Sequence, residues 1–219
     1  MSKALTLLCL FLILAGSAQL LAQSPRLLPR NTMKVSFDAT NPAFPSLGRA
    51  DAPVAIVEFS EFSCPYCRRH ASDVLPRLLE KYVNAGQVRY FFAQMPIDGE
   101  RNSKVAAIAL LCAAQANATL PMYRLLFQDA EIDRMKVDAA AAALGLEVES
   151  FVRCEDSADT QAQLLTHLNM ARKSNVLGTP TFFIGRIRGG RLVDIQTTFG
   201  IKTVDYFESV VDRLLKDRS

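Results

Sequence analysis

Hydrophobic positions in the first half of the chain predict a strand, a helix and a second strand. Residues 54–59 and 88–92 are apolar runs of strand length, and the second run lies between Gly86 and Pro96. Residues 65–83, between the two runs, carry apolar side chains at helical spacing. A strand–helix–strand unit of this length predicts two parallel strands joined by a right-handed crossover.

A long Ala-rich stretch follows, in which the apolar positions keep helical spacing from about residue 100 to residue 173. After a first helix, this spacing predicts further helices over residues 120–127, 137–144, 148–154 and 158–173. The stretch is therefore expected to be a helical insertion of roughly seventy residues.

Strand character returns near the C-terminus. Residues 181–184 and 192–197 are strand-like, and Gly189-Gly190 between them is a hairpin turn signal. A final helix is expected over residues 204–215. The predicted order is strand–helix–strand, helical insertion, then two strands and a helix.

The N-terminus has the pattern of an export signal. Lys3 precedes an almost wholly apolar run over residues 4–15, and small residues follow at positions 16–18 and at Ala22. The run has the length of a signal peptide and is short for a membrane-spanning helix. We interpret residues 1–22 as a signal peptide cleaved after Ala18 or Ala22, with an uncleaved membrane anchor as the alternative.

Residues 23–48 are rich in proline and polar side chains, which predicts an extended N-terminal segment with one short strand near residues 33–37. Residues 49–219 are expected to form one domain that contains the helical insertion. The chain of 219 residues is 50% hydrophobic and 21% charged, as expected of a globular protein. Its formal net charge of +3, without a long basic run, gives no indication of nucleic-acid binding.

Removal of the signal leaves four of the five cysteines. Cys64, Cys67, Cys112 and Cys154 remain, and an even number in an oxidising compartment predicts two disulfides. Of the three pairings, adjacency favours Cys64–Cys67 with Cys112–Cys154, and the second pair would staple the helical insertion. Two separate buried thiols, or a second redox relay, are the alternatives for Cys112 and Cys154.

The segment Cys64-Pro65-Tyr66-Cys67 lies where the predicted strand leads into the predicted helix. Cys64 takes the N-cap position and Pro65 the first helical position, where proline is favoured. Free N–H groups and the helix dipole favour a thiolate there, so we expect the pKa of Cys64 to be lowered to between about 3.5 and 7.5, against the opposing charge of Glu61. Cys67 lies on the apolar helix face and is expected to point inward. Cys64 would then be the nucleophile, and Cys67 would resolve the mixed disulfide.

Two other interpretations of this segment stay open from the residues alone. The pair could be a static disulfide, or Cys64, Cys67 and His70 could bind a soft metal with Cys112 as a fourth ligand. We assign no metal, because the redox interpretation explains the same residues. The other histidine, His167, is expected on a helix surface.

Two motifs together carry a family resemblance. Residues 58–67 read Glu-Phe-Ser-Glu-Phe-Ser-Cys-Pro-Tyr-Cys, and residues 178–183 read Gly-Thr-Pro-Thr-Phe-Phe. In these motifs the chain resembles the DsbA-like branch of the thioredoxin superfamily, from about residue 48 to the C-terminus. The resemblance implies an α/β, thioredoxin-like fold, in which a central mixed sheet is flanked by helices and a helical subdomain is inserted at about residues 100–173.

The resemblance also implies site residues. Thr179-Pro180 matches the family's cis-proline loop, which offers backbone groups to an extended substrate peptide, and Pro65 and Tyr66 belong to the same substrate-binding surface. Glu58 matches the buried acid beneath the active site, which would shuttle the proton of the inner thiol. The residues alone also allow a proline that starts an edge strand and a glutamate on the surface. Tyr66 stands where the family more often has histidine, which leaves the redox potential open.

These observations predict an exported, periplasmic thiol–disulfide oxidoreductase that forms disulfides in exported proteins. Its substrates would be cysteine-containing exported proteins, and a membrane or soluble redox partner would recycle it without a cofactor. A monomer is expected, because residues 23–48 are too few for a dimerisation domain. The alternatives are a disulfide reductase or isomerase of the same fold, or a redox-inactive periplasmic chaperone or metal carrier.

Overall fold

The computed structural model describes residues 35–129 and 132–216. The predicted signal peptide, residues 1–22, lies outside the described residues. A five-stranded sheet forms the centre, with strand order β1-β3-β2-β4-β5. Its strands are β1 (Ser46–Leu47), β2 (Val54–Ser60), β3 (Val88–Gln94), β4 (Thr181–Arg188) and β5 (Arg191–Phe199).

The sheet is mixed, as predicted. β2 and β3 are parallel, in a register that runs from Val54 opposite Val88 to Ser60 opposite Gln94. β4 pairs antiparallel with both β2 and β5, and β1 pairs antiparallel with β3. The predicted hairpin forms at Gly189-Gly190, whose φ angles of 55° and 76° suit glycine. The parallel pair and the hairpin confirm an α/β class with a mixed sheet.

One helical segment fills residues 65–83, the extent that the sequence predicts. It consists of α2 (Pro65–Arg69), the π-helical turn η1 (His70–Val74), α3 (Leu75–Leu78) and the π-helical turn η2 (Leu79–Val83). Pro76 explains the first π turn, because proline lacks the N–H that would bond to the carbonyl of Ser72 and its ring clashes with that carbonyl. The segment therefore changes its hydrogen-bonding pattern without ending.

Five helices separate β3 from β4, where the helical insertion was predicted. They are α4 (Arg101–Gln115), α5 (Thr119–Gln128), α6 (Arg134–Ala143), α7 (Val148–Glu155) and α8 (Ala158–Lys173). Asp133 and Ser157 cap the starts of α6 and α8 by accepting backbone N–H groups of Lys136 and Thr160. The last helix is α9 (Val204–Lys216).

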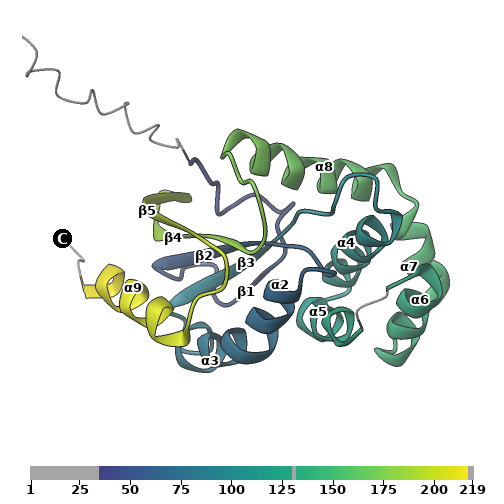
Figure 1. The fold of residues 1–219 in the computed structure, drawn as a ribbon, viewed down its shortest axis with the longest axis horizontal. Coiled ribbons are helices and arrows are strands. Elements are labelled where there is room, and N and C mark those ends of the chain that lie inside the picture. Colours follow the sequence, from purple (N-terminus) through teal and green to yellow (C-terminus); the bar gives the residue numbers. More distant parts are fainter. Residues whose placement is uncertain (1–34, 130–131, 217–219) are drawn as a thin grey trace, which may run out of the picture. The chain divides into compact units, whose positions relative to one another are not determined.

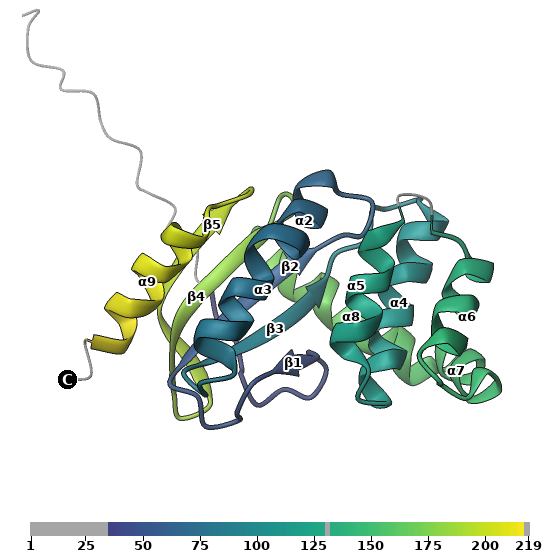
Figure 2. The same cartoon turned by 90° about the horizontal axis from the view of Figure 1, so that it is seen from below.

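The core has two clusters, one on each face of the sheet, because successive side chains of β2 point to opposite faces. Val54, Ile56 and Glu58 face the helical segment 65–83, α9 and the inserted helices, whereas Ala55 and Val57 face α8 and residues 37–44. Figure 1 shows α8 on one side of the sheet and α3 and α9 on the other, and Figure 2 shows α2, α3 and α9 in front of the strands. All seven residues of β2 are buried, because both faces of this strand are covered.

The strand predicted near residues 33–37 is wrong for its described part. Residues 35–37 form no strand, although the carbonyl of Phe37 accepts a hydrogen bond from the backbone N–H of Leu192 at 2.9 Å. Asp38 forms an isolated antiparallel bridge with Arg191, and its carboxylate accepts both the N–H and the hydroxyl of Thr40, which turns the chain directly after this bridge. The Phe37 side chain is buried in the core, where its ring centroid lies 5.0 Å from that of Phe91.

The surface position predicted for His167 is also wrong. Its side chain is fully buried, with Nδ1 accepting the backbone N–H of Gln94 at 2.9 Å and Nε2 donating to the carbonyl of Ala43 at 2.6 Å. Its ring stacks on Phe44 at 4.3 Å, and burial lowers its pKa to about 4. Through these two hydrogen bonds, the neutral side chain of His167 links α8 to β3 and to the N-terminal segment.

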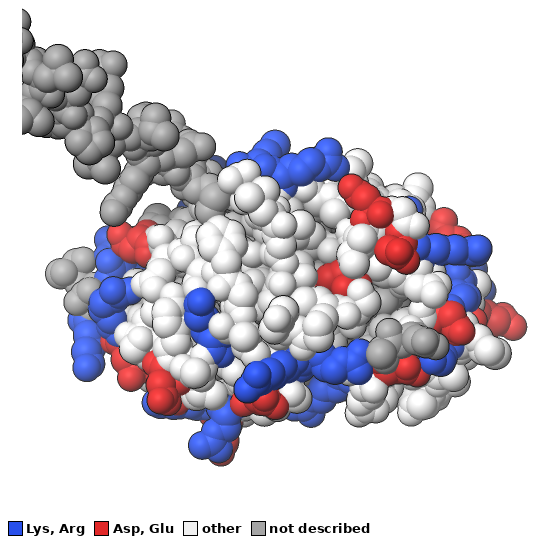
Figure 3. All heavy atoms as spheres, viewed as in Figure 1, with Lys and Arg blue, Asp and Glu red and all other residues white. Residues whose placement is uncertain are grey.

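Charged side chains lie mainly at the margin of the face seen in Figure 3, where both signs are mixed and uncharged atoms occupy the middle. This distribution agrees with the small net charge. Within residues 35–129 and 132–216, no helix is both long enough and apolar enough to cross a membrane.

Candidate active site

The two thiols take different positions at the start of the helical segment. Cys64 is the N-cap of α2, with extended backbone, and is partly exposed, whereas Cys67 is fully buried. The backbone N–H of Cys67 donates to the Cys64 sulfur at 3.3 Å. Pro65 is exposed at the first helical position, and Tyr66 is 58% exposed. The outer and inner thiols are placed as the helical pattern predicts.

The pKa values of the two thiols are shifted in opposite directions. The hydrogen bond with the Cys67 side chain is the largest cause that lowers the pKa of Cys64 to about 6, and Thr179 and the backbone N–H groups at the helix start contribute to the same shift. Burial raises the pKa of Cys67 above its usual range, and the hydrogen bond with Cys64 and the charge of Glu58 add to that rise. At neutral pH the site therefore holds an outer thiolate and an inner thiol.

The loop that precedes β4 lies against the outer thiol. The peptide bond between Thr179 and Pro180 is cis, and the Thr179 carbonyl oxygen lies 3.5 Å from the Cys64 sulfur, where it accepts the S–H when Cys64 is protonated. The Thr181 hydroxyl donates to the carbonyl of Gly178 at 2.6 Å, which holds the loop in place. The structure thus brings together Cys64 and Thr179-Pro180, which lie 115 positions apart in the chain.

Glu58 lies beneath the thiols and is fully buried on β2. The Tyr90 hydroxyl donates to its Oε2 at 2.8 Å, and the Tyr123 hydroxyl donates to Oε1 at 3.1 Å and to Oε2 at 2.9 Å. Burial raises the pKa of Glu58 to about 7, against the lowering effect of Tyr90, Tyr123 and Ser60. A carboxyl group with this pKa can hold or release a proton near neutral pH.

His70 extends this network away from the thiols. Its Nε2 lies 2.9 Å from the Tyr90 hydroxyl, and because that hydroxyl donates to Glu58, the histidine is the donor in this bond. Burial lowers the pKa of His70 to about 3, so the ring is neutral. Since Nε2 is engaged with Tyr90 and the Cys112 sulfur is bonded elsewhere, the four-ligand metal site with Cys64 and Cys67 does not fit this arrangement.

Cys112 and Cys154 are joined by a disulfide that links α4 to α7 within the insertion. The Thr160 hydroxyl lies near both sulfurs, at 3.9 Å from Cys112 and 3.4 Å from Cys154. The bond closes a loop across 42 positions of the chain, which suits a staple for short helices.

Sequence reasoning missed Tyr90, Tyr123 and the partners of Glu61. The sequence holds a weak indication that Tyr90 lies near Glu58, because on β3 its side chain is expected on the same face of the sheet as that of Glu58. It holds no such indication for Tyr123, which contacts Glu58 from α5, 65 positions along the chain. The Glu61 carboxylate bonds to the hydroxyls of Ser63 and Ser103.

A family model described as thioredoxin matches residues 40–197, well over half of the chain. The match places the chain in the thioredoxin superfamily. Relatives named as disulfide bond formation proteins and protein-disulfide oxidoreductases show that it belongs to the DsbA-like family of this superfamily. Its enzyme class is therefore that of a thiol–disulfide oxidoreductase, and cysteine-containing proteins and a redox partner are its general counterparts.

Individual relatives of the chain agree with this membership. A probable disulfide bond formation protein D of Bacillus cereus is 30% identical over 148 residues, which cover 64% of this chain and 68% of that protein. A thioredoxin-like oxidoreductase from Silicibacter pomeroyi is 27% identical, with a TM-score of 0.69 over 82% of this chain and 96% of that one. Wolbachia pipientis α-DsbA1 shares the fold, with 22% identity and a TM-score of 0.72. The match covers 80% of this chain and 92% of that one.

Proposed function

We propose that this oxidoreductase is exported to the periplasm and forms disulfides in cysteine-containing exported proteins through Cys64 and Cys67. The observation that carries the proposal is the pairing of a partly exposed Cys64, whose pKa is lowered to about 6, with a buried Cys67, whose pKa is raised. A low-pKa outer sulfur is a good leaving group, which favours the reduced enzyme and makes its disulfide oxidising.

The reaction begins with the Cys64–Cys67 disulfide. A substrate thiolate attacks the Cys64 sulfur, a mixed disulfide forms between substrate and Cys64, and the bond to Cys67 breaks. Cys67 leaves as a thiolate and takes a proton from Glu58. A second substrate thiolate then attacks the substrate sulfur of the mixed disulfide, so that the substrate gains a disulfide and Cys64 leaves as a thiolate. The substrate loses two electrons and the enzyme gains them.

Glu58 supports this sequence as the proton donor and acceptor for Cys67. The charge of Glu58 contributes to the raised pKa of Cys67, which places the two groups in electrostatic contact. Burial favours the protonated form of both, so one proton shared between them avoids two buried negative charges.

Thr179-Pro180, Pro65 and Tyr66 support substrate binding. The Thr179 carbonyl lies at the Cys64 sulfur, where an extended peptide bearing the reacting cysteine would have to pass. Exposed Tyr66 and Leu177, which is 80% exposed, offer apolar contacts beside this loop. A surface of this kind suits an unfolded chain whose apolar side chains are not yet buried.

Equilibration with glutathione buffers tests the direction of electron flow. The protein to use is a Cys112→Ala, Cys154→Ala double variant, in which only Cys64 and Cys67 titrate. A disulfide-forming enzyme is expected to have a potential between about −120 and −200 mV. A potential near −270 mV would indicate a reductase, and one below about −300 mV would indicate a structural disulfide.

A further inference from the structure

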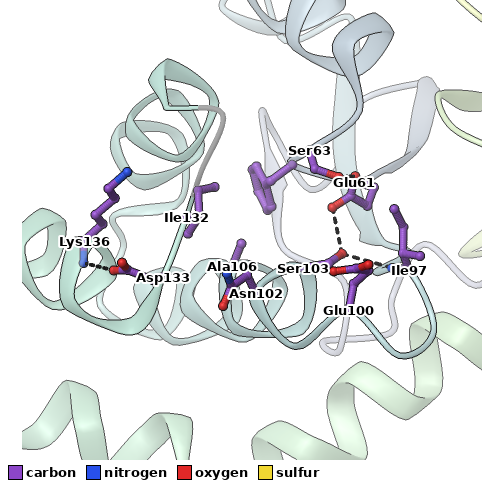
Figure 4. Close-up of a pocket in the computed structure, with 11 residues that line it drawn as sticks. Glu61, Ser63, Ile97, Glu100, Asn102, Ser103, Ala106, Ile132, Asp133 and Lys136 are labelled. Atoms are coloured by element: carbon purple, nitrogen blue, oxygen red, sulfur yellow. Dashed lines mark hydrogen bonds between the residues drawn. The ribbon is translucent and has the colours of Figure 1, made fainter.

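Glu61 holds an unusual position in the turn between β2 and α2. The residue is 3% exposed, and each carboxylate oxygen accepts a hydroxyl hydrogen bond. The Ser63 hydroxyl donates to Oε2 at 2.5 Å, and the Ser103 hydroxyl donates to Oε1 at 2.7 Å (Figure 4). The Glu61 carboxylate is thus hydrogen-bonded by one serine at each of its two oxygens.

The backbone of the same residue acts on both redox cysteines. The Glu61 carbonyl accepts the backbone N–H of Cys64 at 3.2 Å. Its own backbone N–H is among the groups that lower the pKa of Cys67, against the opposing effect of burial. The conformation of residue 61 therefore affects the backbone of Cys64 and the surroundings of the Cys67 thiol.

Ser103 connects this turn to the helical insertion. It is a buried residue of α4, and its Oγ accepts the backbone N–H of Ile97 at 3.0 Å while it donates to Glu61. Figure 4 shows the hydroxyl of Ser103 between Glu61 and Ile97. The Ser103 hydroxyl, on α4 of the insertion, is thus hydrogen-bonded both to the β3–α4 connection and to the turn between β2 and α2.

Glu61 is buried, but it also borders open space. Two hollows, of about 440 Å³ and about 570 Å³, both have Glu61 and Ile97 in their walls. On the side that faces this space, the two serine hydrogen bonds fix the rotamer of the carboxylate. Glu61 lies three positions before Cys64, so a change in the position of its charge changes the surroundings of the Cys64 thiolate.

We propose that Glu61 is a positioning residue, which Ser103 ties to the helical insertion so that the turn keeps Cys64 as the reactive thiolate. The inference rests on the proposed redox role of Cys64 and Cys67. It gives the insertion a second function besides covering the core, because α4 supplies the hydroxyl that anchors the turn.

Ser103→Ala is the decisive variant, because it removes the anchor and leaves the Glu61 charge in place. We expect the pKa of Cys64, followed by thiolate absorbance at 240 nm, to rise by about half a unit to one unit. The alkylation rate of Cys64 at pH 5.5 should then fall about threefold to tenfold. Ser103→Thr keeps the hydroxyl and should restore the wild-type values.

Two further variants complete the test. Glu100→Gln removes an exposed carboxylate from the wall of the same hollow and should leave the Cys64 pKa unchanged. Ser63→Ala removes the other serine from an exposed position, so it gives a foldable variant if Ser103→Ala does not fold. It should raise the pKa in the same direction by a smaller amount.

The inference is overturned if the foldable serine variants keep the wild-type Cys64 pKa and alkylation rate, even if their melting temperature falls. Loss of stability alone would show a merely structural role. If the wild-type protein itself shows no preferential alkylation of Cys64 and no exchange with glutathione, the proposed function fails and the positioning role fails with it.

Discussion

The Tyr123 hydroxyl donates to both carboxylate oxygens of Glu58, at 3.1 Å and 2.9 Å. Glu58 belongs to the central strand β2, whereas Tyr123 belongs to α5 of the insertion. The insertion therefore completes the surroundings of the buried acid. Tyr90, from the neighbouring strand β3, supplies the other phenol, and burial still outweighs both phenols in setting the pKa of Glu58.

Removal of the Tyr123 hydroxyl should raise the pKa of Glu58 above its value of about 7. The hydrogen bond favours the charged form, so its loss in Tyr123→Phe favours the protonated form. The carboxyl resonance of Glu58 in a pH titration by NMR measures this directly. Tyr206→Phe removes a phenol elsewhere in the chain and should leave the titration unchanged, whereas a lower Glu58 pKa in Tyr123→Phe would contradict the assignment.

Glu58 should make the stability of the protein depend on pH. Its folded pKa of about 7 lies above the value of 4.5 for a free carboxyl group, so the folded state binds the extra proton between these pH values. Stability therefore falls as the pH rises from about 4.5 to 7, by up to about 3 kcal/mol.

Glu58→Gln should abolish that dependence. The oxidised protein is the form to measure, because its two active-site thiols do not titrate. Urea unfolding at pH 4 and pH 8 should show the variant gaining stability relative to the wild type as the pH rises. The opposite sign would mean that Glu58 is charged in the folded protein across this range.

The thiolate of Cys64 should depend on Cys67. Titration of the reduced protein at 240 nm should show one thiolate forming with a pKa of about 6. In Cys67→Ala this pKa should rise, because the hydrogen bond with the Cys67 side chain is the largest cause of its lowering. Cys112→Ala with Cys154→Ala is the matched control, in which the pKa should not move.

The disulfide of the insertion should contribute to stability and leave the redox chemistry unchanged. Because the bond spans 42 positions, the double variant Cys112→Ala, Cys154→Ala should lose about 4 kcal/mol of unfolding free energy in the chain-entropy model. Denaturant unfolding measures this loss. A change in the Cys64–Cys67 potential of the double variant would show that the second disulfide also takes part in electron transfer.

The sequence predicts the parts of the fold that rest on local periodicity and turn chemistry. The helical segment after Cys64, the parallel pair β2–β3 and the Gly189-Gly190 hairpin follow from apolar spacing and from the backbone freedom of glycine. The inner and outer placement of the two thiols follows from the same helical spacing.

Polar contacts between distant segments could not be predicted in this way. Tyr123 and Ser103 lie on helices whose apolar spacing says nothing about which hydroxyl meets which carboxylate. His167 was misplaced for the same reason, because its partners come from β3 and from the N-terminal segment. In place of the strand expected near residue 35 there is a single antiparallel bridge between Asp38 and Arg191, and the chain turns at Thr40 directly after it.

Cys64 is proposed to form the mixed disulfide with the substrate, and Cys67 is proposed to attack that mixed disulfide when the reaction runs from reduced enzyme and oxidised substrate. To test this, reduced Cys67→Ala is incubated with an oxidised peptide that contains one disulfide. Mass spectrometry of the digested, unreduced product then identifies which cysteine of the protein has formed a disulfide with the peptide. We expect one covalent adduct, at Cys64, which accumulates in Cys67→Ala and does not accumulate in the wild type. No adduct at Cys64, or an equal amount in both proteins, would contradict it.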